Sequence, residues 1–161
     1  MSNERGKTRG FFMKAATVFF MLMVLGTAGL FAQTKPVTAL SSEDGKTVFI
    51  PAGQPGGEAK FFSFTTARGV TVRFFAILDG TGKIHVAFDA CDVCYQAKKG
   101  YRVVSGFAVC NNCGSRFPLA AIGRDNQTGG CWPSFLPVTV SGASVAVRVA
   151  DLEKKQYLFP M

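Results

Sequence analysis

Two Cys-x-x-Cys pairs constrain this chain more than any other feature of its sequence. Cys91 and Cys94 form the first pair, and Cys110 and Cys113 form the second pair after 15 intervening residues. Two residues between thiols allow a tight turn to aim both sulfur atoms at one point, and two such turns facing each other close a tetrahedral cage of four sulfurs. The spacing therefore predicts a metal site, and it requires a fold in which two turns distant in sequence meet.

Four thiolates suit several metals. Zinc, mononuclear iron and iron–sulfur clusters are all bound by cysteine sulfur, so the spacing indicates a metal without selecting one. Two other uses of the thiols stay open, because exported cysteines often form structural disulfides and because Cys-x-x-Cys is also a motif of thiol–disulfide exchange. The chain has five cysteines, so complete pairing within the chain would leave one thiol over. That odd number favours the metal.

Two further residues are candidates at this site. Cys131 follows Gly129 and Gly130, whose small size lets the backbone approach the cage, so we expect Cys131 to be an additional ligand or a redox thiol. A buried, unreactive thiol is the alternative. His85 precedes Cys91 by six residues, and we rank it as a weaker candidate ligand than the cysteines. We favour the interpretation that the ring nitrogens of His85 make ordinary hydrogen bonds.

Aromatic and acidic residues flank the cysteine pairs. We expect Tyr95, Tyr101 and Phe117 to shield the cage from water, because a shielded site has a shifted reduction potential. Asp89 is expected to form a turn, and Asp92 is expected to be solvated.

The amino end predicts export. Four basic residues precede the uncharged stretch 15–32, which is typical of a cleaved signal peptide or of an uncleaved membrane anchor. In either case the basic flank stays inside, and the remainder is periplasmic or anchored to the outer face of the cytoplasmic membrane. We therefore expect three parts: the signal or anchor at 1–32, a polar linker at 33–45, and a metal-binding β domain at 46–161.

The rest of the chain predicts a mostly β, small α+β domain. Runs rich in β-branched and aromatic residues predict strands at 46–50, 59–66, 70–78, 83–88, 136–140 and 144–150. Turn residues at 79–82 predict a hairpin, and those at 141–144 predict a second strand pair. The C-terminal run 151–159 is too short to be helical unless it packs on something. The picture is a compact β domain whose site is built on loops, preceded by one N-terminal hydrophobic helix.

Charge and motifs exclude several function classes. The chain has 18 basic and 10 acidic residues, but the basic residues are scattered, with pairs only at 98–99 and 154–155. This distribution argues against nucleic-acid binding, which needs a basic cluster. No activated nucleophile, acid pair or phosphate-binding loop is recognisable, so we expect a metal-binding module or electron carrier without substrate chemistry of its own.

The second cysteine turn resembles a known ligand loop. CNNCGSRF is similar to the second ligand loop of Rieske proteins, with Cys113 in the place of a histidine. The resemblance implies a Rieske-like site in which two β-loops present the ligands. A zinc-ribbon-like site is the alternative.

The three cysteine motifs together resemble one family. AFDACDVCYQAKKGY, VCNNCGSRFP and GGCWP, in this order between about Val70 and Pro137, are similar to the FtrD-like membrane iron–sulfur proteins. The resemblance implies an iron–sulfur cluster held outside the cytoplasmic membrane by Cys91, Cys94, Cys110 and Cys113; Cys131 also matches the family motif. It further implies a membrane iron-uptake permease or a redox protein as partner.

Three functions follow from these observations. The first is an exported iron–sulfur or iron-binding protein, either released or membrane-tethered, that transfers electrons beside a ferrous-iron uptake or redox system. The second is a structural zinc-ribbon adaptor, and the third is a thiol–disulfide oxidoreductase.

Overall fold

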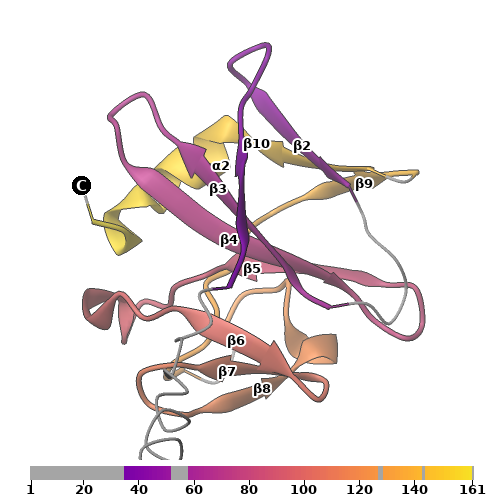
Figure 1. The fold of residues 1–161 in the computed structure, drawn as a ribbon, viewed down its shortest axis with the longest axis vertical. Helices are drawn as coiled ribbons and strands as arrows, with labels where there is room; N and C mark the ends of the chain where they lie inside the picture. Colours follow the sequence, from indigo (N-terminus) through magenta and orange to yellow (C-terminus); the bar gives the residue numbers. More distant parts are fainter. Residues whose placement is uncertain (1–34, 52–57, 127–128, 143, 161) are drawn as a thin grey trace, which may run out of the picture. The chain divides into compact units, whose positions relative to one another are not determined.

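The computed structural model describes residues 35–51, 58–126, 129–142 and 144–160 (Figure 1). These residues form three small β-sheets with a few short helices, so the predicted mostly β fold is confirmed. The predicted N-terminal segment, residues 1–32, lies outside the described residues. Among the helices that the structure describes, none is long and apolar enough to cross a membrane.

The first sheet has four strands in the order β1-β3-β4-β5. These strands span Val37–Leu40, Lys60–Thr65, Thr71–Leu78 and Ile84–Phe88. β3, β4 and β5 are antiparallel neighbours, whereas β1 pairs with β3 in parallel. The predicted hairpin of 70–78 and 83–88 is confirmed, because the Asp79 carboxylate closes its turn by accepting hydrogen bonds from the backbone N–H groups of Thr81 and Lys83.

β1 lies inside residues 33–45, the segment that the sequence predicts to be a linker. Four residues of that segment, Val37–Leu40, extend the first sheet. Their side chains are mostly exposed, so backbone pairing with β3 rather than apolar burial holds this strand in place. A strand without a buried face leaves no alternating pattern in the sequence.

Both faces of the first sheet are buried, which explains the long apolar runs of β3, β4 and β5. Successive side chains of a strand point to opposite faces. The face toward the second sheet carries Phe62, Phe64, Val72, Phe74, Val86 and Phe88. The face toward the cysteines carries Phe61, Phe75, Ile77 and Ala87. Strands covered on both sides have nearly continuous apolar sequences.

The second sheet covers one face of the first. It has the order β2-β10-β9, and these strands span Thr47–Pro51, Ser144–Arg148 and Thr139–Ser141. The predicted strand pair around residues 141–144 is confirmed by the antiparallel pairing of β9 and β10. The strand predicted over 144–150 ends at Arg148, and its last two residues begin α2, Val149–Lys154, which buries Val149 and Leu152 in the same core. This packing is what so short a helix needs.

The third sheet carries the second cysteine pair. It has the order β6-β7-β8, and these strands span Tyr101–Val104, Phe107–Cys110 and Arg116–Pro118. It lies below the first sheet in Figure 1, where Tyr101, Ala108 and Cys110 join Phe75 and Ala87 in one buried cluster. Cys110 therefore ends a strand whose position is fixed by apolar packing.

A buried carboxylate, Asp89, joins three parts of the chain. Its Oδ2 lies 2.6 Å from Nζ of Lys35 and 3.8 Å from Nε of Arg73, and its Oδ1 accepts the backbone N–H of Tyr101 at 2.6 Å. Burial raises the pKa of Asp89, while the Lys35 ammonium and the Tyr101 N–H oppose that rise. The sequence predicts only a turn at Asp89, but in the structure it is a shared acceptor in the interior.

Gly100 leaves the space that this carboxylate occupies. Its φ is +61°, and an added Cβ would overlap the Asp89 side chain. We predict that Gly100→Ala lowers the free energy of unfolding by about 2 kcal/mol more than Gly106→Ala. Gly106 is a matched control, because its φ is +78° and nothing lies within 4 Å of an added Cβ. Urea denaturation followed by circular dichroism measures both losses, and equal losses would contradict the close packing.

Candidate metal centre

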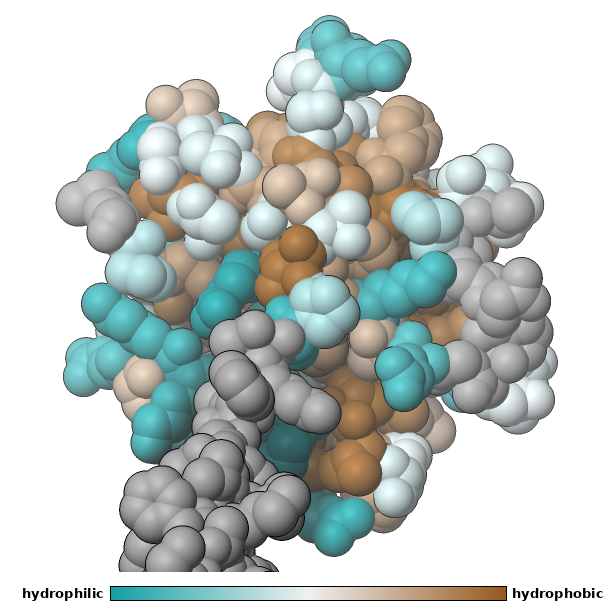
Figure 2. All heavy atoms as spheres, viewed as in Figure 1, coloured by the Kyte–Doolittle hydropathy of each residue, from teal (hydrophilic) through white to brown (hydrophobic). Residues whose placement is uncertain are grey.

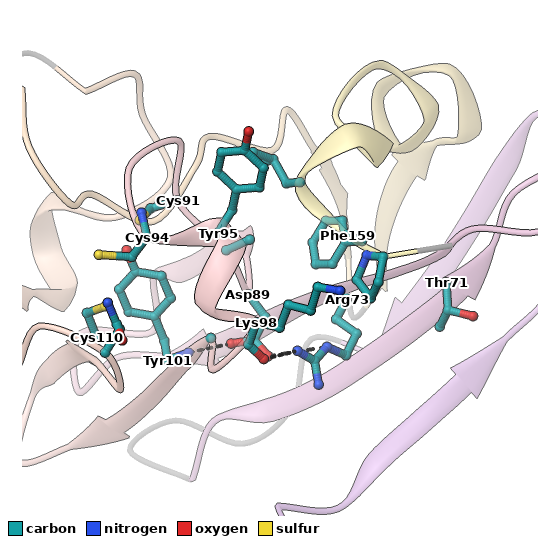
Figure 3. Close-up of a pocket in the computed structure, with 15 residues that line it drawn as sticks. Thr71, Arg73, Asp89, Cys91, Cys94, Tyr95, Lys98, Tyr101, Cys110 and Phe159 are labelled. Atoms are coloured by element: carbon teal, nitrogen blue, oxygen red, sulfur yellow. Dashed lines mark hydrogen bonds and ion pairs between the residues drawn. The ribbon is translucent and has the colours of Figure 1, made fainter.

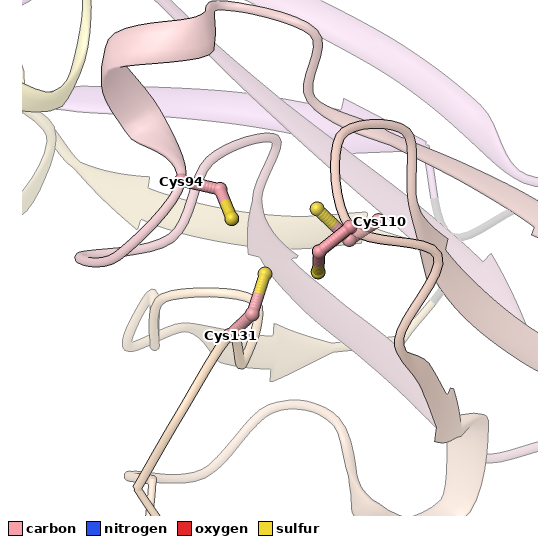
Figure 4. Close-up of side chains that lie close together, drawn as sticks. Cys94, Cys110 and Cys131 are labelled. Carbon is pink, nitrogen blue, oxygen red and sulfur yellow. The ribbon is translucent and has the colours of Figure 1, made fainter.

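Three separate segments bring the thiols together. The loop after β5 carries Cys91 and Cys94, the end of β7 and its following turn carry Cys110 and Cys113, and the loop before β9 carries Cys131. The sulfur atoms of the last four cysteines all lie within 4.8 Å of one another. The three side chains labelled in Figure 4 point toward one another, as the ligands of a metal must. We call Cys94, Cys110, Cys113 and Cys131 the thiol group.

Local hydrogen bonds shape both cysteine turns. In the first turn, the backbone N–H of Cys94 donates to Sγ of Cys91 at 3.0 Å, and the 3₁₀ helix Tyr95–Ala97 follows. In the second turn, the N–H of Gly114 donates to the carbonyl oxygen of Cys110 at 3.0 Å. Gly114 has a φ of +76°, a left-handed conformation that glycine adopts without strain. These local interactions hold two sulfur atoms on each cysteine turn.

The thiol group differs from the set that the spacing predicts. Cys94, Cys110 and Cys113 belong to both sets, but Cys131 occupies the place that the spacing assigns to Cys91. Cys91 stays close, because it is buried and its Sγ lies 3.2 Å from Sγ of Cys131. The glycines before Cys131 were the sequence signal for this approach. No sequence signal showed which of the two thiols would lie nearer the other three.

His85 is not part of the thiol group. Its Nε2 lies 2.7 Å from the carboxylate of Asp79, and its Nδ1 lies 3.3 Å from the carbonyl oxygen of Ile122. Hydrogen bonds from Thr81 and His85 lower the pKa of Asp79. The imidazole is therefore engaged at both nitrogens, and it stabilises the β4–β5 hairpin.

The sulfur atoms fit a metal ion. A tetrahedron with metal–sulfur bonds of about 2.3 Å places its sulfurs about 3.8 Å apart. The sulfurs of the thiol group lie within 4.8 Å of one another, so small side-chain rotations suffice to close a cage around one ion. Iron–sulfur clusters also take thiolate ligands, but their several iron atoms separate the sulfurs further. The donors therefore suit iron or zinc, and their spacing suits a single ion most directly.

The thiols differ in exposure and in acidity. Cys113 is exposed, and hydrogen bonds from the hydroxyl and the backbone N–H of Ser115 lower the pKa of its thiol to about 6. Cys131 is buried, and burial raises the pKa of its thiol. In the metal-free chain at neutral pH, Cys113 is therefore a thiolate while Cys131 keeps its proton. A metal that binds Cys131 would release that proton.

Aromatic side chains cover the thiol group. Tyr101 is buried, and its hydroxyl donates to the carbonyl oxygen of Cys131 at 3.2 Å. The Phe117 ring packs edge-on against Trp132 and Tyr101, with centroid distances of 5.0 Å and 6.4 Å. Tyr95 instead packs on a tyrosine of the C-terminal 3₁₀ helix. Tyr101 and Phe117 thus cover the thiols as the sequence predicts, and Trp132 joins them.

A cavity of about 310 Å³ opens beside the thiols (Figure 3). Cys91, Cys94 and Cys110 line it together with two cationic side chains, Arg73 and Lys98. Arg73 comes from the middle of β4, and no sequence pattern connects that strand with a cysteine turn. Only the fold shows that this cation stands near the thiols.

Asp92, next to Cys91, is more constrained than the sequence predicts. Its side chain is 56% exposed, which agrees with a solvated residue. However, its Oδ1 accepts a hydrogen bond from the Tyr157 hydroxyl at 2.8 Å and lies 3.2 Å from Nζ of Lys155. These contacts lower the pKa of Asp92 against the opposing effect of partial burial, and they link the first cysteine turn to the C-terminal segment.

Comparison with known proteins identifies one family model. Residues 55–159 match the model of a family described as "Membrane iron-sulfur containing protein FtrD-like". The match contains all five cysteines. No significant match was found among curated proteins or among solved structures.

We predict that Cys113 of the metal-free protein reacts as a thiolate near pH 6. Because Ser115 stabilises the charged form, the thiolate is lost only as the pH falls through about 6. The rate of alkylation by iodoacetamide, followed at this cysteine by peptide mass spectrometry, should reach half its maximum near that pH. In Ser115→Ala the half-maximum should move upward. A half-maximum near the ordinary thiol value of about 8.5 in the unmodified chain would contradict the assignment.

At equilibrium with oxidised glutathione, the metal-free protein should accumulate a disulfide between Cys91 and Cys131, after the exposed Cys113 thiolate has formed the first mixed disulfide and exchange has passed the bond inward. The sulfur atoms of Cys91 and Cys131 are 3.2 Å apart, so little movement is needed. Oxidised glutathione takes up the two electrons and two protons that the thiols lose, and it becomes two glutathione thiols. Peptide mapping under non-reducing conditions should find this crosslink, and Cys91→Ser should lack it. A dominant bond between Cys110 and Cys113 would contradict the geometry.

Proposed function

This chain belongs to the FtrD-like family of membrane iron–sulfur containing proteins, and from that premise we propose that it is an exported electron-transfer protein. Its domain binds iron at the outer side of the cytoplasmic membrane, either released into the periplasm or tethered by residues 1–32. Its partner is a membrane iron-uptake permease or the redox protein that serves one. The observation that carries this proposal is the convergence of four thiols from three segments.

We propose the thiol group as the ligand set. Cys94, Cys110, Cys113 and Cys131 would hold the metal, with Cys91 as a neighbouring thiol in contact with Cys131. The alternative set, which follows from the spacing and the family resemblance, has Cys91 in place of Cys131. Bound iron would supply one-electron exchange between its ferrous and ferric states.

The chain itself controls how water and a partner reach the site. Tyr101 and Phe117 cover the buried side of the thiol group and exclude water there, which tunes the reduction potential of a bound metal. Cys113 is the exposed member of the thiol group, so a partner protein can approach the metal most closely there. One shielded side and one exposed ligand are typical of centres that exchange electrons with other proteins.

A structural zinc site is the second candidate. The sulfur separations suit one ion, and zinc is the commonest single ion bound by four cysteines in structural sites. In that case the metal only stabilises the third sheet and the loops around it. The thiol–disulfide oxidoreductase is supported only by the proximity of Cys91 and Cys131 and by the lowered pKa of the exposed Cys113 thiol, neither of which explains why four thiols converge.

Metal analysis and absorption spectroscopy distinguish an iron centre that transfers electrons from a structural zinc site. We predict that the full-length protein, purified without oxygen, contains iron and is coloured, and that its colour bleaches on reduction. Colourless protein that contains zinc would contradict electron transfer and favour the structural site.

Single substitutions identify the ligands. Cys94→Ser, Cys110→Ser, Cys113→Ser and Cys131→Ser should each lose most of the metal, whereas Cys91→Ser should retain most of it. Cys91→Ser is the matched control, because it removes a neighbouring thiol of the same kind. The opposite result for Cys91 and Cys131 would restore the ligand set that the spacing predicts.

A further inference from the structure

Exposed cations gather around the second cysteine turn. Residues 93–124, which include three of the four thiols of the group, contain five basic residues and no acidic residue. Three of these cations, Lys98, Lys99 and Arg102, are exposed and follow one another along the segment that leads into β6. We call these three residues the basic face. Figure 2 shows hydrophilic residues on the lower left of the molecule, over this segment.

The basic face is attached to the turn that carries Cys110 and Cys113. The Arg102 guanidinium donates to Oδ1 of Asn111 at 2.9 Å, and the Asn111 amide donates to the carbonyl oxygen of Lys99 at 3.0 Å. Lys98, which precedes Lys99 in the sequence, and Cys110 line the same cavity. The cations are therefore held beside the thiols by the fold, although sequence alone shows only a scattered charge distribution.

No carboxylate neutralises the basic face within the part of the chain that the structure describes. The two acidic residues nearest in sequence to the first cysteine turn have other partners: Asp89 pairs with Lys35, and Asp92 contacts Lys155. The exposed surface at Lys98, Lys99 and Arg102 therefore carries positive charge that no carboxylate of the described residues balances. Such charge attracts anionic molecules and raises their rate of encounter.

We propose that the basic face is a docking surface for an acidic protein, namely an electron-transfer partner whose own redox site is surrounded by carboxylates. This inference rests on the proposed electron transfer, and it adds the charge and the location of the partner's contact. Electrostatic complementarity would orient that partner over the exposed Cys113, and Val93 in the first cysteine turn, which is 62% exposed, is available for an apolar contact. The shielding by Tyr101 and Phe117 leaves this side as the close approach to the metal.

Poly-glutamate serves as the probe, because it is an acidic polypeptide without redox chemistry. Binding of fluorescently labelled poly-glutamate to the full-length protein is measured by fluorescence anisotropy at low ionic strength. The triple variant Lys98→Gln, Lys99→Gln, Arg102→Gln should bind at least about tenfold more weakly. Binding to the unmodified chain should weaken as salt is added, because the Debye length falls to about 10 Å at 0.1 M.

A second triple variant controls for net charge. Lys46→Gln, Lys83→Gln, Lys154→Gln removes the same charge from exposed positions outside residues 93–124. Its binding should stay within about twofold of the unmodified chain. Equal losses in both variants would show that poly-glutamate responds only to total charge, and unchanged binding in the first variant would show that it docks elsewhere. Either result overturns the proposal.

Alkylation locates the contact on the surface. In metal-free protein, poly-glutamate should slow the reaction of Cys113 with the neutral reagent iodoacetamide, and this protection should be absent from the Lys98, Lys99, Arg102 variant. Circular dichroism of both triple variants establishes that they are folded. Protection that persists in this variant would contradict docking on the basic face.

Anionic lipid is the competing occupant, and vesicles distinguish it. The full-length protein is compared on phosphatidylcholine vesicles with and without phosphatidylglycerol. If the anionic lipid strengthens binding through the basic face and poly-glutamate does not compete, the surface contacts a membrane and the protein partner is overturned. If the protein contains zinc but still binds poly-glutamate at the basic face, only the proposed electron transfer is contradicted. If the protein contains iron but does not bind poly-glutamate at the basic face, only the proposed docking surface is contradicted.

Discussion

Holding four sulfur atoms within 4.8 Å of one another is the constraint on which the structure depends. Four thiolates at such distances repel, and a metal-free chain cannot ionise all of them. The fold supplies the opposing stabilisation through the apolar cluster between the first and third sheets, which includes Phe75, Ala87 and Tyr101. The fold also gives the thiols different pKa values, since that of the exposed Cys113 is lowered and that of the buried Cys131 is raised.

Much of this architecture could be predicted from local patterns. β3, β4 and β5 of the first sheet, the β4–β5 hairpin and the β9–β10 pair all follow from runs of apolar residues bounded by turn residues. The two cysteine knuckles follow from their spacing. What local patterns do not contain is contact between distant residues. Cys91 and Cys131 are 40 residues apart in the sequence, and Lys35 and Asp89 are 54 residues apart. β1 has no buried face, so its sequence lacks the alternating apolar pattern that predicts a strand.

Asp89 shows why such contacts matter for the site. One buried carboxylate binds Lys35, approaches Arg73 on β4 and accepts the N–H of Tyr101 at the start of β6. Burial of a charge is unfavourable unless partners compensate it. Removal of any one partner of Asp89 would therefore destabilise the buried carboxylate and shift the remaining partners. Because Tyr101 also contacts Cys131, the position of the thiol group depends on an ion pair that the sequence does not reveal.

The chain contains one tryptophan, and its position next to the thiols has a spectroscopic consequence. Trp132 directly follows Cys131 and packs against Phe117 at 5.0 Å, and its indole Nε1 has no hydrogen-bond partner within the described residues. Its intrinsic emission therefore originates beside the sulfur atoms and nowhere else in the molecule. An iron centre that absorbs at the near-ultraviolet wavelengths of indole emission would quench that emission by energy transfer, whereas a zinc–thiolate site does not absorb there and would not quench it in this way. The emission of Trp132 would therefore report which metal is bound.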